Sequence, residues 1–227
     1  MTDLDDRPRL DEFSIAARAA RELQTGMVVN LGFGIPMLVN LFVEPEREVL
    51  FHSENGILGF GPVITDNPDK VDPGCINAGG QPVERIPGMS FMSHDQSFEL
   101  IRGGWIDLSI LGALEVGVNG DLANYHVPGK IAGSLGGGQD LAFCAKRVLV
   151  VMTHHDRAGR SKLVPRLGLA LTAPACVRRI VTDISVIDLT PAGAVLVEIL
   201  PGWTAEEVRQ VTAVPLELSP DLVEMTL

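Results

Sequence analysis

Residues 27–42 read MVVNLGFGIPMLVNLF, and this stretch decides the class of fold. Its first five residues, 27–31, are an apolar and β-branched run that predicts a buried strand. Residues 32–36 carry two glycines and a proline and are expected to turn the chain. Residues 37–42 then begin a helix, with the proline near its first turn. A strand, a glycine-bearing turn and a helix in succession are typical of α/β proteins.

The same alternation continues on both sides of this stretch. An amphipathic helix is predicted over residues 11–23, ending near Gly26, and a later one over 204–211 opens with a Thr-x-x-Glu capping box. Apolar runs predict further strands at 49–51, 106–111, 147–152, 179–183, 186–189 and 195–200, and residues 141–146 are helix-like. We therefore expect an α/β sandwich that ends in an exposed, proline-containing tail near 216–227.

Length and composition favour a single domain over residues 1–227. The chain is 46% hydrophobic, which is enough to bury a sizeable core. Its three cysteines lack metal-ligand spacing and its first residues are acidic, so we expect a cytoplasmic location. Its apolar runs fall short of the roughly 18 residues that span a bilayer. The net charge of −11 argues against nucleic-acid binding, so neither membrane nor nucleic acid is an expected partner.

A carboxylate stands where one of the predicted strands should end. Residues 53–56 read Ser-Glu-Asn-Gly, directly after the apolar run and before a glycine-rich turn. Ligands bind at the carboxyl ends of strands in open α/β sheets, and a carboxylate there can attack an activated acyl group. Glu54 is therefore a candidate nucleophile. The alternative is a glutamate in a surface turn, because Glu and Asn are common in loops.

Three further glycine clusters interrupt the predicted elements at strand ends. The first, at 30–34, lacks the third glycine of a dinucleotide fingerprint and is weak evidence for NAD. The second is the long segment 112–130, and long glycine-bearing segments inside compact domains are often functional. The third, at 133–138, could present backbone N–H groups to an oxyanion or a phosphate, or could serve as a flexible connector.

Short motifs spread over almost the whole chain carry a resemblance to a known family. They are Asn-Leu-Gly-Phe-Gly-Ile-Pro at 30–36, Ser-Glu-Asn-Gly at 53–56, Asn-Ala-Gly at 77–79, Ile-Arg-Gly-Gly at 101–104, Gly-Asp-Leu-Ala-Asn at 120–124, Pro-Gly-Lys at 128–130 and Gly-Gly at 136–137. In order and spacing they resemble the β-subunit of the family I CoA-transferases, which include the succinyl-CoA:3-ketoacid, 3-oxoadipate and acetate:acetoacetate enzymes. The resemblance implies an open three-layer α/β sandwich of the sugar-phosphate isomerase and CoA-transferase type.

The resemblance also implies a covalent mechanism and a partner chain. Glu54 matches the family's nucleophile, which carries CoA as a glutamyl thioester between a donor acyl-CoA and an acceptor carboxylic acid, expected here to be a 3-oxoacid. Coenzyme A is then a substrate, and no permanently bound cofactor and no metal are expected. The family works with an α-subunit, usually as an α2β2 heterotetramer, so this chain would supply half of an active site.

Other residues are expected to bind substrate or to stabilise the oxyanion. Lys130 is the candidate CoA-binding cation, while Asn55 and Gly56 are expected chiefly to shape the turn that holds Glu54. The oxyanion or substrate-binding candidates are the side chain of Asn30 together with Gly32, Gly34, Asn55, Gly136, Gly137 and Gly138.

The chain departs from the family pattern at positions that bear on substrate choice. Gly80 stands where many relatives carry lysine, Gln139 where they carry methionine, and Trp105 where they carry histidine. We expect Trp105 to be a packing residue. Residues 166–173 also lack the usual Cys-Thr-Leu-Pro-Leu-Thr-Gly. Two alternatives therefore stay open: a CoA-thioester hydrolase on the same scaffold, and a non-catalytic ligand-binding subunit.

The histidines are given simpler interpretations. His154 and His155 follow a predicted strand, where adjacent side chains point to opposite faces, which argues against a metal site. The same alternation should turn His52 away from the face that Glu54 uses. His126, inside the 112–130 segment, is a possible substrate contact.

Overall fold

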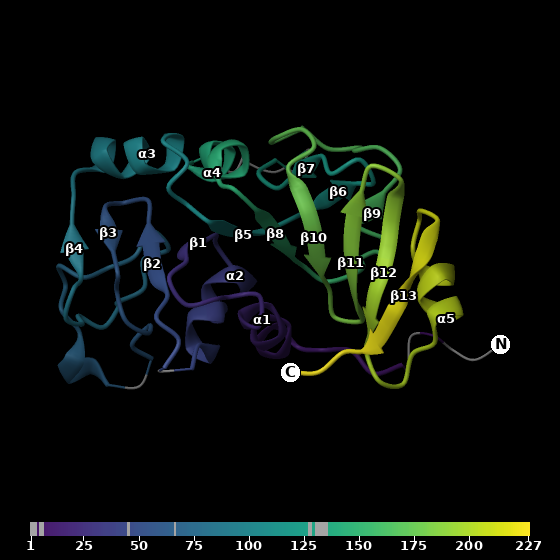
Figure 1. Ribbon diagram of the computed structural model, residues 1–227, viewed down its shortest axis with the longest axis horizontal. Helices are drawn as coiled ribbons and strands as arrows, with labels where there is room; N and C mark the ends of the chain where they lie inside the picture. Colours follow the sequence, from purple (N-terminus) through teal and green to yellow (C-terminus); the bar gives the residue numbers. More distant parts are fainter. Residues whose placement is uncertain (1–3, 5–6, 45, 66, 127–128, 130–135) are drawn as a thin grey trace.

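One mixed sheet crosses the whole molecule (Figure 1). The computed structural model describes residues 4, 7–44, 46–65, 67–126, 129 and 136–227. Within these residues, ten strands form the sheet in the order β13-β12-β11-β10-β8-β5-β1-β2-β3-β4. They are β1 (Val28–Leu31), β2 (Leu50–Ser53), β3 (Ile57–Leu58), β4 (Ser90–Phe91), β5 (Leu108–Gly112), β8 (Val148–Val151), β10 (Val177–Val181), β11 (Ser185–Thr190), β12 (Gly193–Ile199) and β13 (Leu216–Glu224).

The middle of the sheet, from β10 to β2, is parallel. Strand β1 lies between β2 and β5, with Val29 opposite Phe51 on one side and Leu108 on the other. The chain passes from β1 to β2 and then crosses back to β5, so the direction of winding reverses at β1. In open α/β sheets, ligands bind beside such a reversal, at the carboxyl ends of the strands.

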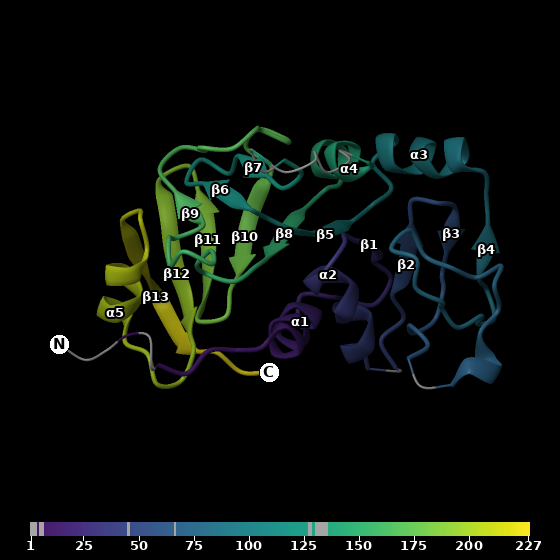
Figure 2. The same ribbon diagram turned by 180° about the vertical axis from the view of Figure 1, so that it is seen from behind.

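Helices cover the central strands from two sides (Figures 1 and 2). On one side α1 (Glu12–Ala20) packs with α2 (Ile35–Leu38) and the 3-10 helix η2 (Val39–Phe42), and the α1 residues Ile15, Ala16 and Ala19 are fully buried. On the other side α3 (His94–Arg102) packs with α4 (Gly138–Cys144), where Ile101, Ile106 and Leu141 form a second buried cluster. This arrangement confirms the predicted three-layer α/β fold.

Three smaller features complete the described architecture. The helix α5 (Ala205–Val211) packs against β12 and carries the predicted capping box, in which Thr204 and Glu207 bond reciprocally. A short 3-10 helix, η3, spans Pro68–Lys70. A separate small sheet among the described residues contains β7 (Leu122–Ala123), β6 (Glu115–Gly117) and β9 (Leu163–Val164). The expected loop at 112–130 therefore contains a hairpin, β6–β7.

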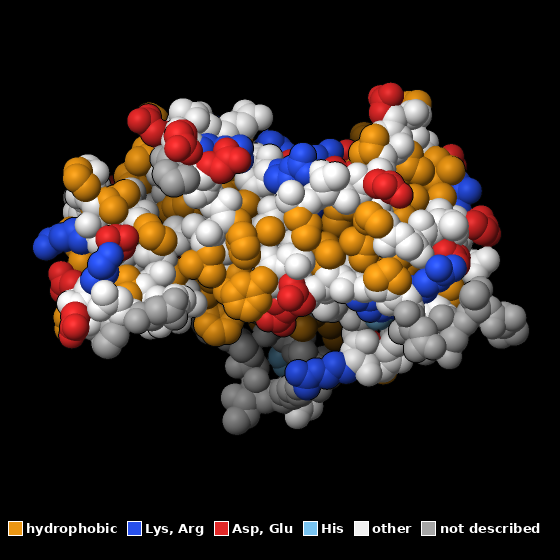
Figure 3. Space-filling view, turned by 90° about the horizontal axis from the view of Figure 1, so that it is seen from below, with side chains coloured by type: hydrophobic (Ala, Val, Ile, Leu, Met, Phe, Trp, Pro, Cys, Tyr) orange, Lys and Arg blue, Asp and Glu red, His pale blue; other side chains and the backbone are white. Residues whose placement is uncertain are grey.

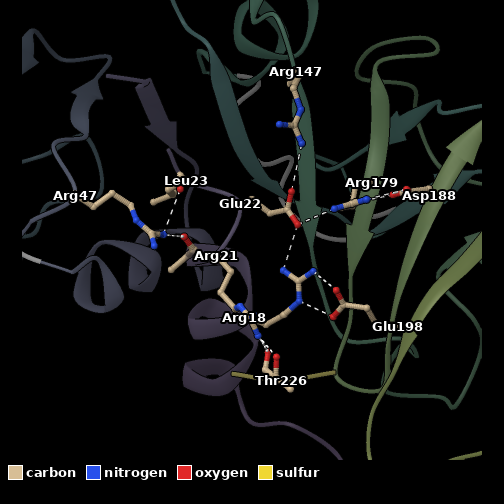
Figure 4. Close-up of polar contacts among 11 residues, drawn as sticks. Arg18, Arg21, Glu22, Leu23, Arg47, Arg147, Arg179, Asp188, Glu198 and Thr226 are labelled. Atoms are coloured by element: carbon tan, nitrogen blue, oxygen red, sulfur yellow. Dashed lines mark hydrogen bonds and ion pairs between the residues drawn. The ribbon is translucent and has the colours of Figure 1, made fainter. Parts of the chain in front are cut away.

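A network of buried charges ties α1 to the far half of the sheet (Figure 4). The guanidinium of Arg18, 4% exposed, donates to both carboxylate oxygens of Glu198 at 2.7 and 2.6 Å. Arg18 also pairs with Glu22, which accepts from Arg179 at 2.8 Å, and Arg179 in turn holds Asp188. Such two-point pairs fix geometry as well as charge, so α1 has one position relative to β10, β11 and β12.

The prediction of an exposed tail near 216–227 is wrong. Strand β13 pairs in parallel with β12, with Leu218 opposite Leu196, and the side chains of Leu216 and Met225 are buried. Most other side chains of β13 are exposed or half-buried, because it is the edge strand of the sheet. Edge strands tolerate proline and charged residues, and here these residues disguised the strand as a tail.

The face opposite α3 and α4 is mixed in character (Figure 3). Apolar side chains stand on it beside acidic and basic ones. Phe13 of α1 and Phe42 of η2, on this side of the sheet, are 54% and 38% exposed. No described helix is both long enough and apolar enough to cross a lipid bilayer.

Candidate active site

A cavity of about 410 Å³ opens at the carboxyl ends of β1, β2 and β5, beside the reversal of winding. The end of β1 contributes Asn30 to Phe33, β2 contributes Ser53 and Glu54, and β5 contributes Leu111 to Ala113. The remaining wall comes from the start of α4, the 78–79 segment and the end of β7. The predicted nucleophile thus lies in a concave site at the expected edge of the sheet.

Glu54 is held by a tight turn that directly follows β2. The backbone N–H of Gly56 donates to the carbonyl of Ser53 at 2.9 Å. Position 56 needs glycine twice, because its φ is +109° and because a Cβ there would collide with the backbone oxygen of Met92. Asn55 donates from Nδ2 to the carbonyl of Ile76 at 2.6 Å, so it shapes this turn as expected and does not line the cavity.

The carboxylate of Glu54 lies against the backbone of Gly137, across the cavity from β2. A Cβ at position 137 would overlap Oε2 of Glu54, so a larger residue at this position would displace the carboxylate. Glu54 is half-buried, and no ion pair of its carboxylate is found within the described part of the chain. Glu54 is also the only charged side chain among the described residues that line the cavity.

The side chain of Asn30 is engaged below the cavity floor. Its Nδ2 donates to the carbonyl of His52 at 3.1 Å and to the ring Nδ1 at 3.0 Å, and Nε2 of His52 meets Oγ of Ser97 at 2.9 Å. Burial lowers the pKa of His52 to about 4, so the ring is neutral and can accept at Nδ1. The N–H groups of Asn30, which we expected to serve an oxyanion, are therefore directed at His52.

A second amide, that of Asn124, lies on the wall next to α4. Its Oδ1 accepts from the hydroxyl of Thr172 at 2.8 Å, and its backbone N–H donates to the same hydroxyl oxygen at 3.1 Å. Gln139 donates from Nε2 to the carbonyl of Thr172 at 3.0 Å. The sequence marked Gln139 only as a departure and Asn124 only as part of a motif. Their meeting point, Thr172, had no signal in the sequence.

The other predicted residues divide into two groups. Gly32, Gly136, Gly137 and Gly138 line the cavity, as does Asn30. Gly34 does not, because it caps α2 with a φ of +86°. Lys130 lies outside the described residues, so its role as a CoA-binding cation stays a prediction.

Trp105 is not the packing residue that we expected. Its side chain is 65% exposed, and it lies beside Gly103 where α3 ends. Gly80, the other marked departure, closes a turn by donating its N–H to the carbonyl of Asn77 at 2.9 Å, and a Cβ at position 80 would meet open space. Neither residue contacts the cavity in the described structure.

His154 and His155 are engaged by the protein itself. His154 is buried and contacts the hydroxyls of Thr182 and Thr212, at 3.3 and 2.9 Å, and Nε2 of His155 donates to the carbonyl of Val211 at 2.9 Å. Within the described residues, no three His, Cys, Asp or Glu side chains are placed to hold a metal ion.

The comparisons with known proteins agree on one family. The family model "Coenzyme A transferase" matches residues 13–210. The chain is 45% identical over 206 residues to a probable coenzyme A transferase β-subunit of Bacillus subtilis (strain 168), covering 90% of this chain and 93% of that protein. It is 43% identical over 210 residues to the 3-oxoadipate CoA-transferase β-subunit of Pseudomonas putida, covering 92% and 97%.

A solved structure matches the fold at lower identity. An acyl-CoA transferase from Escherichia coli O157:H7, determined as a thioester complex with CoA, gives a TM-score of 0.75 at 21% identity. The match covers 97% of this chain but only 44% of that one.

Proposed function

Because the chain belongs to the coenzyme A transferase family, we propose that it is a β-subunit that transfers CoA through a thioester on Glu54. The donor is an acyl-CoA and the acceptor is a small carboxylic acid. The observation that carries the proposal is the position of the Glu54 carboxylate, inside the cavity at the strand ends and against Gly137.

Each chemical step uses the carboxylate or the carbonyl of Glu54. The carboxylate attacks the thioester carbonyl of the donor, the C–S bond breaks, and a mixed anhydride and a CoA thiolate form. The thiolate attacks the Glu54 carbonyl, the anhydride C–O bond breaks, and the donor acid leaves as its carboxylate. The acceptor carboxylate then attacks the glutamyl thioester and the steps run in reverse, so no ATP is consumed.

Negative charge develops on a carbonyl oxygen at every attack. We assign its stabilisation to backbone N–H groups of Gly137 and Gly138, which lie beside the carboxylate, because the Asn30 amide is directed at His52. A preorganised donor of this kind is typically worth about 3 to 4 kcal/mol. The leucine-rich part of the wall would limit the access of water, which otherwise hydrolyses the anhydride or the thioester.

The partner and the substrate class are further parts of the proposal. The relatives are β-subunits, and one of them belongs to a 3-oxoadipate enzyme, which supports a partner α-subunit and a 3-oxoacid as one substrate. An α2β2 assembly is the expected form. The solved relative is more than twice as long as this chain, which is consistent with a site completed by a second subunit. The unpaired cysteines support a cytoplasmic location.

Trapping of the covalent intermediate tests the proposal. The chain, co-produced with its partner subunit, is incubated with acetoacetyl-CoA or succinyl-CoA, and the intact masses of both chains are recorded. A CoA-sized addition to the peptide that contains Glu54, lost after borohydride reduction, is expected. Glu54→Gln should abolish the addition, and Glu48→Gln, an exposed glutamate just before β2, should retain it.

Two results would contradict the proposal. An addition that persists in Glu54→Gln would place the nucleophile elsewhere. A folded complex that releases CoA at the same rate with and without an acceptor acid would instead identify a thioester hydrolase.

A further inference from the structure

The amide of Asn124 is held in one orientation on the cavity wall. Its Oδ1 accepts the hydroxyl proton of Thr172 at 2.8 Å, which leaves the Nδ2 end directed elsewhere. The backbone of Asn124 also bonds the same hydroxyl, and Gln139 fixes the backbone of Thr172 from α4. An amide oriented by two other side chains is a preorganised hydrogen-bond donor.

The free end of this amide lies next to the reacting carboxylate. Nδ2 of Asn124 is 3.9 Å from the position that a Cβ of Gly138 would take, and the neighbouring position at Gly137 would overlap Glu54. Consecutive Cα atoms are about 3.8 Å apart, so the two side chains face adjacent residues of one turn. An acyl group attached at Glu54 would therefore extend past the amide.

The rest of the described wall offers little that could bind a second charge. Leu111, Leu114 and Leu141 are apolar, and no lysine or arginine is among the described residues that line the cavity. Tyr125 also lines it, but no hydrogen bond within the described part of the chain orients its hydroxyl. Asn124 is thus the fixed side-chain donor that faces the acyl chain, and a neutral oxygen is the acceptor that it fits.

We propose that Asn124 is a specificity-determining residue whose Nδ2 donates a hydrogen bond to the oxo oxygen at carbon 3 of a 3-oxoacyl group. Thr172 is then a positioning residue that orients the amide, and Gln139 holds Thr172. The inference rests on the proposed transfer reaction and names the group on the substrate that this chain recognises.

The test compares two acceptors that differ by the oxo group alone. The complex with the partner subunit is assayed for CoA transfer from succinyl-CoA to acetoacetate and to butyrate, and kcat/KM is measured for each acid. In Asn124→Leu, kcat/KM for acetoacetate should fall about 10- to 100-fold, the usual effect of losing a buried hydrogen bond to substrate. The value for butyrate should change less than about 3-fold.

Three further variants separate recognition from folding. Asn124→Asp keeps the shape and the acceptor for Thr172 but removes the donor, so it should lose acetoacetate selectively even if Asn124→Leu folds poorly. Thr172→Val should reduce the preference for acetoacetate, and Thr172→Ser should restore it. Asn119→Leu, an exposed asparagine in the β6–β7 turn and outside the cavity, is the matched control and should leave both values unchanged.

The outcomes distinguish this inference from the proposed function. Equal losses for both acids in the Asn124 variants, or no loss for either, would overturn the recognition of the oxo group while transfer itself stands. A wild-type complex that transfers CoA to neither acid would overturn the proposed function and this inference together.

Discussion

Gly137 and Glu54 are packed so closely that the glycine has no room for a side chain, although 82 intervening residues separate them in sequence. The contact joins the turn after β2 to the start of α4, the two elements that face each other across the cavity. It therefore sets where the carboxylate can lie.

Gly137→Ala is expected to lower kcat/KM of CoA transfer by about 100-fold, because a displacement of the nucleophile by about 1 Å costs that much. The measurement is a steady-state assay with a melting curve. Gly168→Ala is the matched control, since a Cβ there would lie 3.5 Å from the carboxylate of Glu115, an ordinary contact away from the cavity. An unchanged rate in Gly137→Ala would show that the carboxylate can relocate freely.

Ser53 braces the segment that lies beside Glu54. Its hydroxyl accepts the backbone N–H of Ala78 at 2.8 Å, and the serine is buried. Ser53→Ala should leave that N–H unpaired and lower the free energy of unfolding by about 1 to 3 kcal/mol. Urea denaturation measures the loss. Ser219→Ala removes a similar bond to Asp221 on the edge strand and should cost under about 0.5 kcal/mol. Equal losses in the two variants would contradict this account.

Arg18 is expected to be the most sensitive residue of the charge network. Arg18→Met leaves Glu198 and Glu22 without their buried partner and should lower the free energy of unfolding by about 3 to 5 kcal/mol. Arg21→Met changes an exposed arginine of the same helical segment and should cost less than about 1 kcal/mol. Chemical denaturation of both variants would show whether the buried pair or helix propensity is responsible.

His52 makes stability depend on pH. Its pKa falls from 6.5 to about 4 on folding because the ring is buried, so below pH 6.5 the unfolded chain takes up a proton that the folded chain refuses. Stability is therefore lost as the pH falls from 6.5 toward 4, by at most about 3 kcal/mol from this group. His52→Gln should flatten the curve in that interval, and identical pH profiles for wild type and variant would contradict the assignment.

The sequence predicted the strands that bury continuous apolar runs. Residues 147–152 and 195–200 did so because parallel and inner strands are covered on both faces, whereas β13 exposes charged residues and a proline and was missed. Helix α3 was also missed, although Ser93 and Gln96 form a capping box at its start. Its single buried cluster leaves too little apolar periodicity.

The candidate site was predictable only in part. Glu54 and the 136–138 glycines could be found because each stands at a predicted strand or helix end. The pairing of Asn124 with Thr172 could not, because it joins residues 48 positions apart through two side chains. The engagement of Asn30 by His52 depends on the register of β1 and β2, which the sequence does not specify.

The charge network also orders events during synthesis of the chain. Arg18 and Glu198 are 180 residues apart, and a ribosome adding about 5 to 20 residues per second needs about 10 to 40 s to pass from one to the other. During that time the first helix lacks the acidic partner that lets its arginine be buried. The segment that is translated first is therefore expected to dock among the last.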